Sequence, residues 1–418
     1  MRRNGRRATW AIAAGLFLLL AAVYWYSVPT SFNTVYMNRQ FFDSDGEFIT
    51  RQFRLGSVFT HNDHLLYHVT ARVGSRLASA LGHVDSGAVV IHKLMSVIGG
   101  ALAGAWLFVI GRRLTGRTSA ALGAALLASG CAAWWFFSAT IDTYMPNVLA
   151  SVLAVGVALR CLRTRQLVDF ALLGATVGLA FLLRTDSFLL AVLGAVLLVE
   201  PQKFGRNLVA CVIGGVVVGA IGYAALAHAF YGVPLSDVAS WSLGHSARPE
   251  TSRMWGLTTN LTAANVSLVS VNHGVFAVWL PGLMQTRVPD VLAVGTPALV
   301  AHGLLALVVG AGMVLSLRRG APRRRESAIV VGMAVAWVLS RVGFYAWWDP
   351  ADPFLFAGTS LPALWLLTVH ALRDPNLSAE PELSASPRVV MSEAVLWLMT
   401  VMVWWHNWSR LIAPLRVL

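Results

Sequence analysis

The chain has 418 residues, of which 57% are hydrophobic and only 12% are charged. Soluble domains carry about 25% charged residues, so this composition excludes an ordinary soluble domain and predicts an integral membrane protein. The formal net charge of +13 does not indicate a nucleic-acid partner, because the basic residues form short groups between apolar runs, as in the cytoplasmic loops of membrane proteins. Cys131, Cys161 and Cys211 lie inside apolar runs without a metal-binding spacing, which predicts packing roles.

The first apolar run, residues 8–27, follows four arginines at positions 2, 3, 6 and 7. At about 1.5 Å per residue, it is long enough to cross the roughly 30 Å hydrocarbon core of a bilayer. It exceeds the apolar part of a typical signal peptide and ends in the interface aromatics Tyr24, Trp25 and Tyr26. We therefore expect an uncleaved anchor with a cytoplasmic amino terminus.

The next segment is expected to be the first external loop. Asp43, Asp45, Glu47 and Asp63 are four of only 19 acids in the chain, and they follow shortly after the first apolar run. Acids grouped beside a membrane wall indicate chemistry at the water boundary. A second interpretation stays open: Ser44 and Glu47 have the spacing of a helix capping box, so part of this polarity would only begin a short helix in a solvated loop.

Histidines follow in the same loop. His61, His64 and His68 recur at spacings that place them on one helical face, with Asp63 beside them. His61, Asp63 and His64 form a set able to ligate a divalent ion such as Mg²⁺ or Mn²⁺, and the same face could instead bind phosphate. The alternative is an amphipathic helix that lies on the membrane with its polar side in water.

Apolar runs long enough to span a membrane continue along the chain, and with the first run they make about eleven. They lie near residues 87–110, 118–137, 143–162, 167–183, 187–199, 207–230, 291–316, 325–346, 354–371 and 389–406. We therefore predict one all-α polytopic membrane domain over residues 1–418, with long external segments at 28–86 and 231–290. Semi-apolar stretches near 64–83 and 264–288 are expected to form interfacial helices in these segments.

The basic clusters test this count, because positive residues stay on the cytoplasmic side of a membrane. If every run crosses once, the clusters share the side of the amino terminus; they lie at residues 112–117, 160–165, 203–206, 318–325 and 373. The opposite side then receives both long external segments. The sequence thus predicts an active face outside the cytoplasm.

Several of these residues carry a resemblance to a known family. The segments SDGEFITRQFRLG and THNDHLLYHVTARVGSRL resemble the first external loop of GT-C membrane glycosyltransferases, in particular the protein O-mannosyltransferase-like branch. The positions that match that branch are Gly46-Glu47-Phe48-Ile49, Leu55-Gly56, His61 and Leu66-Tyr67. The later segment FFSATIDTYMPNVLASVLAV resembles the branch's third-to-fourth helix turn. The likeness covers roughly the first 200 residues.

The sequence departs from the family pattern at two places. Ser44 occupies the position of the family's acid, with Asp43 and Asp45 on either side, and Asn62-Asp63-His64 replaces Pro-Pro-Gly. The first departure leaves open which acid is the base, and the second leaves open the acceptor. Glu47 is expected to cap or orient the loop.

Sugar transfer from a lipid phosphate requires a carboxylate that takes the proton of the acceptor hydroxyl, and cations that steady the leaving phosphate. The catalytic candidates are Asp43, Asp45 and, in a supporting role, Glu47. The candidate substrate contacts, all expected near the outer face, are Arg184, Lys93, His61, His64, Arg341, Asp142 and Tyr144. Two alternatives stay open: Arg184 would form a structural ion pair with Asp186, and Lys93 would only extend to the interface.

These observations predict a GT-C-type glycosyltransferase of a bacterial inner membrane. It would transfer a mannose-like or other sugar from a polyprenyl-phosphate donor to a glycan, lipid or protein acceptor, with inversion, at the extracytoplasmic face. A transporter or flippase is the alternative, but transporters tend to show repeats and midplane charges, whereas the charges here gather at one face. Because the acid motif is shifted, a catalytically inactive lipid-binding scaffold is a third reading.

Overall fold

The computed structural model describes residues 3–28, 46–54, 64–83, 88–243, 321–347, 354–372 and 387–413, together with 307, 310, 311 and 314. In these ranges the regular structure is entirely helical, which confirms the predicted all-α class. The helices along the first part of the chain are α1 (Arg3–Tyr26), α2 (Gly46–Arg54), α3 (Leu65–Ala80), α4 (Val89–Thr115), α5 (Thr118–Gly130), α6 (Ala132–Ala139) and α7 (Tyr144–Thr164).

The second part of the chain continues in the same way. Its helices are α8 (Leu167–Leu183), the 3₁₀ helix η2 (Thr185–Val199), α9 (Phe204–Gly215), the π-helix η4 (Val216–Ile221), α10 (Gly222–Tyr231), α11 (Val238–Leu243), α15 (Ala321–Trp347), α16 (Phe354–Ala371) and α17 (Pro387–Asn407). Short one-turn helices lie at Pro201–Lys203 and Leu235–Asp237, and a π-turn at Trp408–Ile412 follows α17.

Ten of the eleven predicted apolar runs coincide with helices in the described ranges, and residues 291–316 lie mostly outside them. Four helices in these ranges are both long and apolar enough to span a bilayer: Gly5–Tyr26, Val89–Thr115, Tyr144–Thr164 and Pro201–Tyr231. A fifth candidate is the pair Thr118–Gly130 and Ala133–Ala139, which bends by 66°. The polytopic architecture is therefore confirmed, while the total number of spans stays a prediction.

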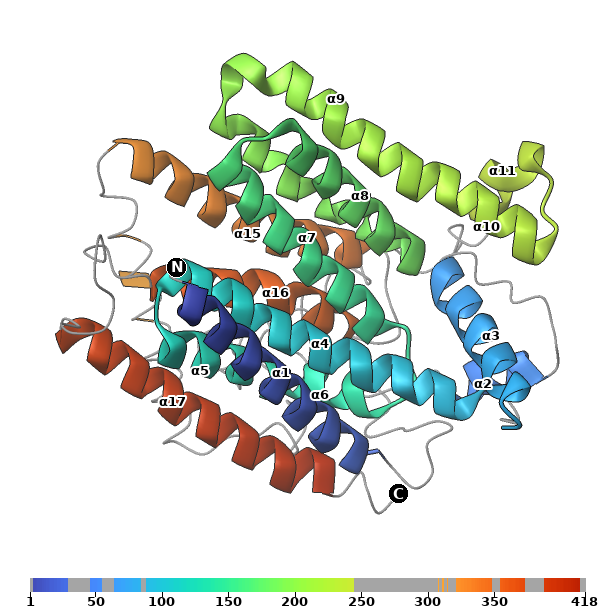
Figure 1. Cartoon of the computed structure of the whole chain (residues 1–418), viewed down its shortest axis with the longest axis horizontal. Helices are drawn as coiled ribbons and strands as arrows, with labels where there is room; N and C mark the ends of the chain where they lie inside the picture. The colour runs from blue at the N-terminus through green and yellow to red at the C-terminus, as the bar shows by residue number, and fades with distance from the viewer. Residues whose placement is uncertain are drawn as a thin grey trace.

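Helix α4 lies at the centre of the bundle, in contact with α1, α5 and α7 (Figure 1). Its small residues let neighbouring elements approach closely: a Cβ on Gly99 would be 2.9 Å from the backbone carbonyl carbon of Met145 in α7. Helices α8 and α9 pack even closer, because a Cβ on Gly174 would be 1.8 Å from the backbone oxygen of Cys211. Small residues at such positions are typical of helix packing in membranes, where van der Waals contact replaces the hydrophobic effect.

The run 187–199 is the shortest of the predicted spans, and the structure shows how it reaches further than its length suggests. Thr185–Val199 forms a 3₁₀ helix, which rises about 2.0 Å per residue rather than 1.5 Å. Its 15 residues therefore extend about 30 Å, the thickness of a hydrocarbon core. Asn147 of α7 joins its first turn to α8, because Nδ2 donates to the Ser187 hydroxyl at 2.6 Å and to the Ala180 carbonyl of α8 at 3.0 Å.

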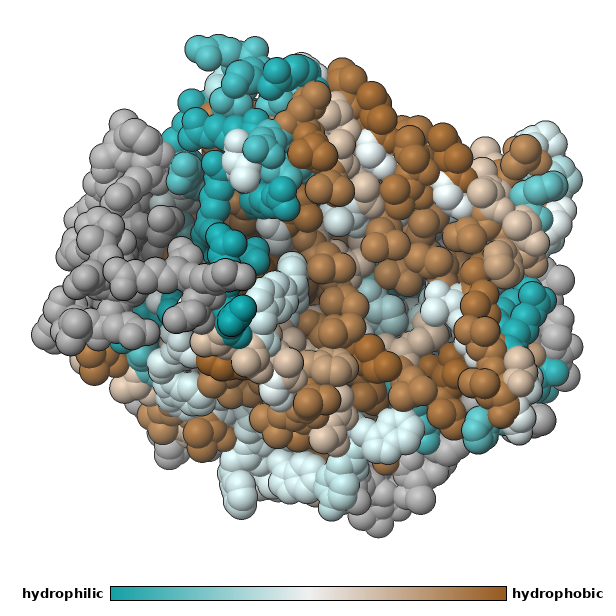
Figure 2. Space-filling view, in the orientation of Figure 1, coloured by the Kyte–Doolittle hydropathy of each residue, from teal (hydrophilic) through white to brown (hydrophobic). Residues whose placement is uncertain are grey.

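The two ends of the bundle differ in chemistry. At one end, which we call the arginine-rich end, arginines join helix termini through contacts between Arg163 and the Arg113 carbonyl, Arg165 and Glu326, Arg325 and the Leu198 carbonyl, and Arg117 and Glu393. The amino terminus lies at this end (Figure 1). Figure 2 shows hydrophilic residues gathered there and hydrophobic residues across the middle. The predicted sorting to the side of the amino terminus thus appears in the fold for arginines of the clusters 112–117, 160–165 and 318–325, while Arg373 lies outside the described residues.

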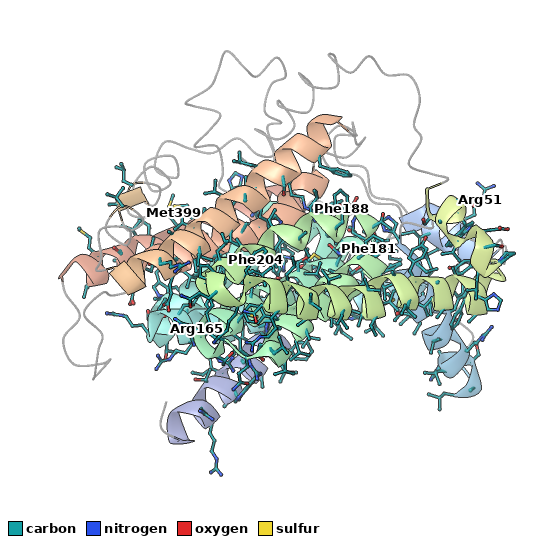
Figure 3. The ribbon with its side chains drawn as sticks, turned by 90° about the horizontal axis from the view of Figure 1, so that it is seen from above. Arg51, Arg165, Phe181, Phe188, Phe204 and Met399 are labelled. Atoms are coloured by element: carbon teal, nitrogen blue, oxygen red, sulfur yellow. The ribbon has the colours of Figure 1, made fainter. Side chains whose placement is uncertain are left out.

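Helices α2 and α3 lie at the opposite end. Arg51 of α2 and Arg165, the residue that follows α7, lie toward opposite ends of the view in Figure 3. Helix α3 packs on α4, α8 and α10, and Arg72 lies 4.9 Å from the centre of the Tyr231 ring. The helix expected near 64–83 is therefore present at the expected end. The stretch 264–288 lies outside the described residues.

Candidate functional site

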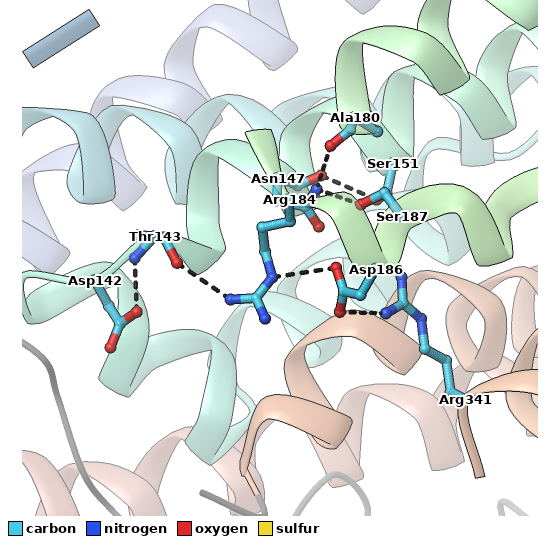
Figure 4. A network of polar contacts seen from close by, with 9 residues as sticks. All are labelled: Asp142, Thr143, Asn147, Ser151, Ala180, Arg184, Asp186, Ser187 and Arg341. Carbon is cyan, nitrogen blue, oxygen red and sulfur yellow. Dashed lines mark hydrogen bonds and ion pairs between the residues drawn. The ribbon is translucent and has the colours of Figure 1, made fainter. Parts of the chain in front are cut away.

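A buried polar network lies at the opposite end, where four segments meet (Figure 4). It combines the turn before α7, the residue that ends α8, the first turn of η2 and the last third of α15. Three of its members, Asp142, Arg184 and Arg341, are substrate contacts predicted from the sequence, and each is 3% exposed or less. Tertiary folding therefore brings together residues that lie up to about 200 positions apart in the chain.

Arg184 is positioned by the break between α8 and η2. Its backbone is extended, with φ −154° and ψ 124°, so the chain changes from one helix to the next at this residue. Its Nη1 donates to the Thr143 hydroxyl at 3.1 Å, and its Nε lies 3.3 Å from Oδ1 of Asp186. Its guanidinium carbon lies 4.4 Å from the centre of the Tyr144 ring, a cation–π contact that strengthens when water is excluded.

Asp186 connects the two arginines. Its Oδ2 accepts a hydrogen bond of 2.7 Å from Nη1 of Arg341, while Oδ1 faces Arg184. The side chains of Arg184, Asp186 and Arg341 are only 4%, 7% and 0% exposed. The ion pair between Arg184 and Asp186, which the sequence left as one of two alternatives, is therefore present in the structure.

The three-residue cluster of Arg184, Asp186 and Arg341 has an unbalanced charge. Counted over these three side chains alone, two guanidinium groups and one carboxylate leave one net positive charge. Within the described part of the chain, Nε and Nη2 of Arg341 are buried and make no hydrogen bond. Buried polar groups in native proteins are nearly always hydrogen-bonded, so two orphan donors on a buried cation require an explanation.

Asp142 occupies the edge of this network and helps to shape the turn. Its Oδ1 accepts a hydrogen bond of 2.6 Å from the backbone N–H of Thr143, which places the Thr143 hydroxyl next to Arg184. Its own carbonyl accepts a hydrogen bond of 3.3 Å from the hydroxyl of Ser96 in α4. Asp142 thus links α4 to the arginine cluster.

Lys93 and His64 occupy other positions at this end. The Lys93 ammonium lies 6.0 Å from the centre of the Trp25 ring in α1, an arrangement consistent with a lysine that extends toward the interface. His64 directly precedes α3, and its ring lies 6.4 Å from that of His68. The expected face of histidines is therefore present for these two residues.

The remaining predicted residues fall in part outside the description. Asp43, Asp45, His61 and Asp63 lie outside the described residues. Glu47 lies in α2, which begins at Gly46, so a short helix does start within the acidic segment. Among the described residues, no group of three metal-ligating side chains is present, and the predicted metal site, most of which lies elsewhere, stays a prediction.

Sequence reasoning did not predict every contact in the network around Arg184. Thr143, Ser96 and the bridging role of Asp186 toward Arg341 appear only in the fold. Asp186 was visible as a neighbour of Arg184, but its bond to Arg341 spans 155 residues. No local pattern signals a partner at that distance.

Comparisons with known proteins agree with this picture. Residues 75–226 match the family model described as dolichyl-phosphate-mannose-protein mannosyltransferase, which is less than half of the chain. No curated protein sequence is significantly similar. The fold is similar to the crystal structure of ArnT from Cupriavidus metallidurans bound to undecaprenyl phosphate, with a TM-score of 0.59 at 13% identity over 98% of this chain and 77% of that one.

Two further structures are similar. The apo state of the same ArnT gives a TM-score of 0.58 at 13% identity, over 99% of this chain and 78% of that one. The archaeal oligosaccharyltransferase AglB from Archaeoglobus fulgidus, in complex with an inhibitory peptide and a dolichol-phosphate, gives 0.47 at 15% identity, over 97% and 56%. At this identity the likeness to ArnT shows the fold alone. The chain is a multi-pass, all-α membrane protein with the fold of the ArnT structures, as the resemblance to GT-C glycosyltransferases led us to expect.

Proposed function

We propose that the chain is a glycosyltransferase that uses a polyprenyl-phosphate-linked sugar as its donor. The observation that carries the proposal is the buried, net-positive cluster of Arg184, Asp186 and Arg341, in which two donors of Arg341 have no partner in the described residues. The similar ArnT structure holds undecaprenyl phosphate, and the matching family model is described by a dolichyl-phosphate-mannose donor. Both names support a lipid-phosphate donor for this chain.

A phosphate suits this cluster for electrostatic reasons. Guanidinium groups bind phosphate through parallel charge-assisted hydrogen bonds, and these bonds are strong where water is excluded. A phosphate oxygen beside Arg341 would accept from Nε and Nη2 and would balance the surplus charge. The same contacts would stabilise the negative charge that develops on the phosphate as the sugar leaves.

Acids of the first external loop would activate the acceptor. Asp45 or Asp43 would take the proton of the acceptor hydroxyl while that oxygen attacks the anomeric carbon from the face opposite the phosphate. One bond to the anomeric carbon forms as the bond to phosphate oxygen breaks, so the sugar's configuration inverts. Asp45 is favoured because it directly precedes Gly46, where α2 begins, and Glu47 would orient the loop.

The proposal is tested by Arg341→Lys in full-length purified protein. Lysine keeps the charge near Asp186 but removes the planar fork, so affinity for undecaprenyl phosphate is expected to fall about 10- to 100-fold. Arg325→Lys is the matched control, because Arg325 lies on the same helix at the arginine-rich end, where it donates to the Leu198 carbonyl. Binding is measured by thermal shift against lipid concentration.

Release of lipid phosphate from a panel of polyprenyl-phosphate sugars then separates an enzyme from a flippase. A wild-type protein that binds the lipid but never releases sugar would contradict the proposed enzyme. Equal affinities in Arg341→Lys and wild type would remove the phosphate from this cluster. Because Arg184 already bonds to Asp186 and Thr143, loss of folding without loss of affinity in Arg184→Ala would give that residue a structural role.

The proposed sidedness places the arginine-rich end in the cytoplasm of a bacterial inner membrane and the polar network at the extracytoplasmic face. The clusters of basic residues at the end of the amino terminus support it, because cytoplasmic loops retain positive charge. Reporter fusions after Lys203 and within 231–290 check this arrangement. The first is expected to report the cytoplasm and the second the outside; a cytoplasmic signal from 231–290 would reverse the proposed active face.

A divalent metal, Mg²⁺ or Mn²⁺, at His61, Asp63 and His64 is a further proposal, supported by the donor types of that loop. Chelation is expected to abolish activity, and added metal to restore it. Full activity after exhaustive chelation, with no metal in the purified protein, would remove this site.

A further inference from the structure

A second buried polar group lies where α2, α3 and α4 meet. His92 of α4 is 0% exposed and stacks on Tyr67 of α3, with ring centres 5.4 Å apart and planes at 21°. Phe53 of α2 approaches the same imidazole edge-on, at 5.8 Å and 89°. The ring of His92 is therefore held by aromatic side chains from two other helices.

Only one nitrogen of this imidazole has a partner in the described structure. Nδ1 lies 3.1 Å from the Tyr67 hydroxyl, whereas Nε2 is buried and makes no hydrogen bond within the described residues. In a neutral imidazole one nitrogen donates and the other accepts. In either tautomer, Nε2 is a hydrogen-bonding group without a partner in the described residues. Burying such a group without a hydrogen bond costs free energy.

His92 is linked to the arginine cluster through its own helix. Residues four apart in a helix lie on one face, so His92 and Ser96 share a face of α4. The Ser96 hydroxyl donates to the Asp142 carbonyl, and the next residue, Thr143, accepts from Arg184. The face of α4 that carries His92 thus contacts, one helical turn further along, the turn that holds Arg184 of the proposed phosphate site.

We propose that Nε2 of His92 binds a hydroxyl group of a sugar, on the donor or on the acceptor. A hydroxyl both donates and accepts, so it satisfies Nε2 in either tautomer. Among the described residues, the side chains in ring contact with His92 are Tyr67 and Phe53, both uncharged, so a neutral hydroxyl suits this position better than an anion. This inference rests on the proposed function and adds a sugar-recognising residue to it.

Three variants of His92 test the proposal. The amide of Asn reaches the place of Nδ1, and that of Gln reaches the place of Nε2, so His92→Gln keeps the sugar contact while His92→Asn loses it. His92→Phe keeps the ring and loses both nitrogens, which provides a variant of native shape. Thermal unfolding midpoints and affinity for bare undecaprenyl phosphate are measured for each variant. The affinity is expected to stay close to wild type, whereas His92→Phe and His92→Gln, which lose the contact with the Tyr67 hydroxyl, are expected to unfold at a somewhat lower temperature.

The deciding measurements use undecaprenyl-phosphate mannose beside the bare lipid, and then acceptor saturation in the transfer reaction. If the donor's sugar is bound, His92→Asn and His92→Phe lose about 3- to 10-fold of the preference for the glycosylated lipid. If the acceptor's hydroxyl is bound, the preference is kept and the acceptor KM rises by a similar factor. His92→Gln keeps most of either property.

Other results overturn the inference. Unchanged preference and unchanged KM in His92→Phe would mean that a buried water or nothing occupies Nε2. Equal losses in His92→Asn and His92→Gln, accompanied by lower unfolding midpoints, would make His92 a packing residue. A wild-type protein that binds no lipid phosphate would contradict the proposed function itself, and that result is read separately, before any His92 variant.

Discussion

The two ends of the bundle use the same side chains in opposite environments. At the arginine-rich end, Arg165 pairs with Glu326 at 3.7 Å, and these side chains are 46% and 38% exposed. At the other end, Arg341 pairs with Asp186 at 2.7 Å, and these side chains are 0% and 7% exposed. The two pairs have the same chemical groups, but only the side chains of the second pair are shielded from solvent.

The difference in water decides what each pair does. Exposed ion pairs contribute about 0–1 kcal/mol, since solvent screens them. A buried pair loses hydration of several kcal/mol per ion and recovers it only through good geometry and further hydrogen bonds. Stability alone therefore explains this cluster poorly, because two donors of the buried Arg341 have no partner in the described residues. The proposed lipid phosphate would supply that partner.

The largest expected effect concerns the acids of the first external loop, which the family resemblance names as candidates for the base. One of Asp43→Asn and Asp45→Asn is expected to lower turnover by about 10²- to 10⁴-fold, because asparagine keeps the shape and removes the base. Undecaprenyl phosphate affinity should stay near that of wild type, measured in the same preparation. Glu326→Gln at the arginine-rich end is the control, and near-normal turnover in both aspartate variants would refute the assignment.

Asp186→Asn sharpens the comparison through stability. It leaves two buried guanidinium groups without their shared carboxylate, and breaking a buried pair in this way typically costs about 3–5 kcal/mol. Reversible unfolding of the purified protein measures the loss. An unfolding free energy within about 1 kcal/mol of wild type would show that water reaches the cluster and that the two ends are electrostatically alike.

The smallest effect is expected at the exposed pair. Arg165→Gln removes a half-exposed partner of Glu326, so the unfolding free energy should change by less than about 1 kcal/mol, and less still in high salt. The same unfolding assay applies. A loss as large as that of Asp186→Asn would mean that the arginine-rich end is stabilised by a network rather than by separate pairs.

Much of the architecture follows from local signals in the sequence. Apolar runs of about 20 residues and the basic groups between them act over short stretches of chain, because a bilayer selects each span by its own length and polarity. That is why ten predicted runs coincide with described helices and why arginines between successive spans, such as Arg113, Arg163 and Arg325, lie at one end. The candidate contacts Asp142, Tyr144, Arg184 and Arg341 were visible for the same reason, as polar residues at the predicted outer ends of spans.

Only the tertiary structure decided how these residues combine. The bond between Arg341 and Asp186 spans 155 residues, and that between His92 and Tyr67 spans 25. The 3₁₀ winding of η2, which gives a short apolar run the reach of a full span, also depends on its neighbours α7, α8 and α15. The sequence by itself determined which segments enter the membrane and which residues are polar there. Helix packing sets which of these polar groups contact one another. The sequence does not show this, because contact between distant segments produces no periodic pattern of residues along the chain.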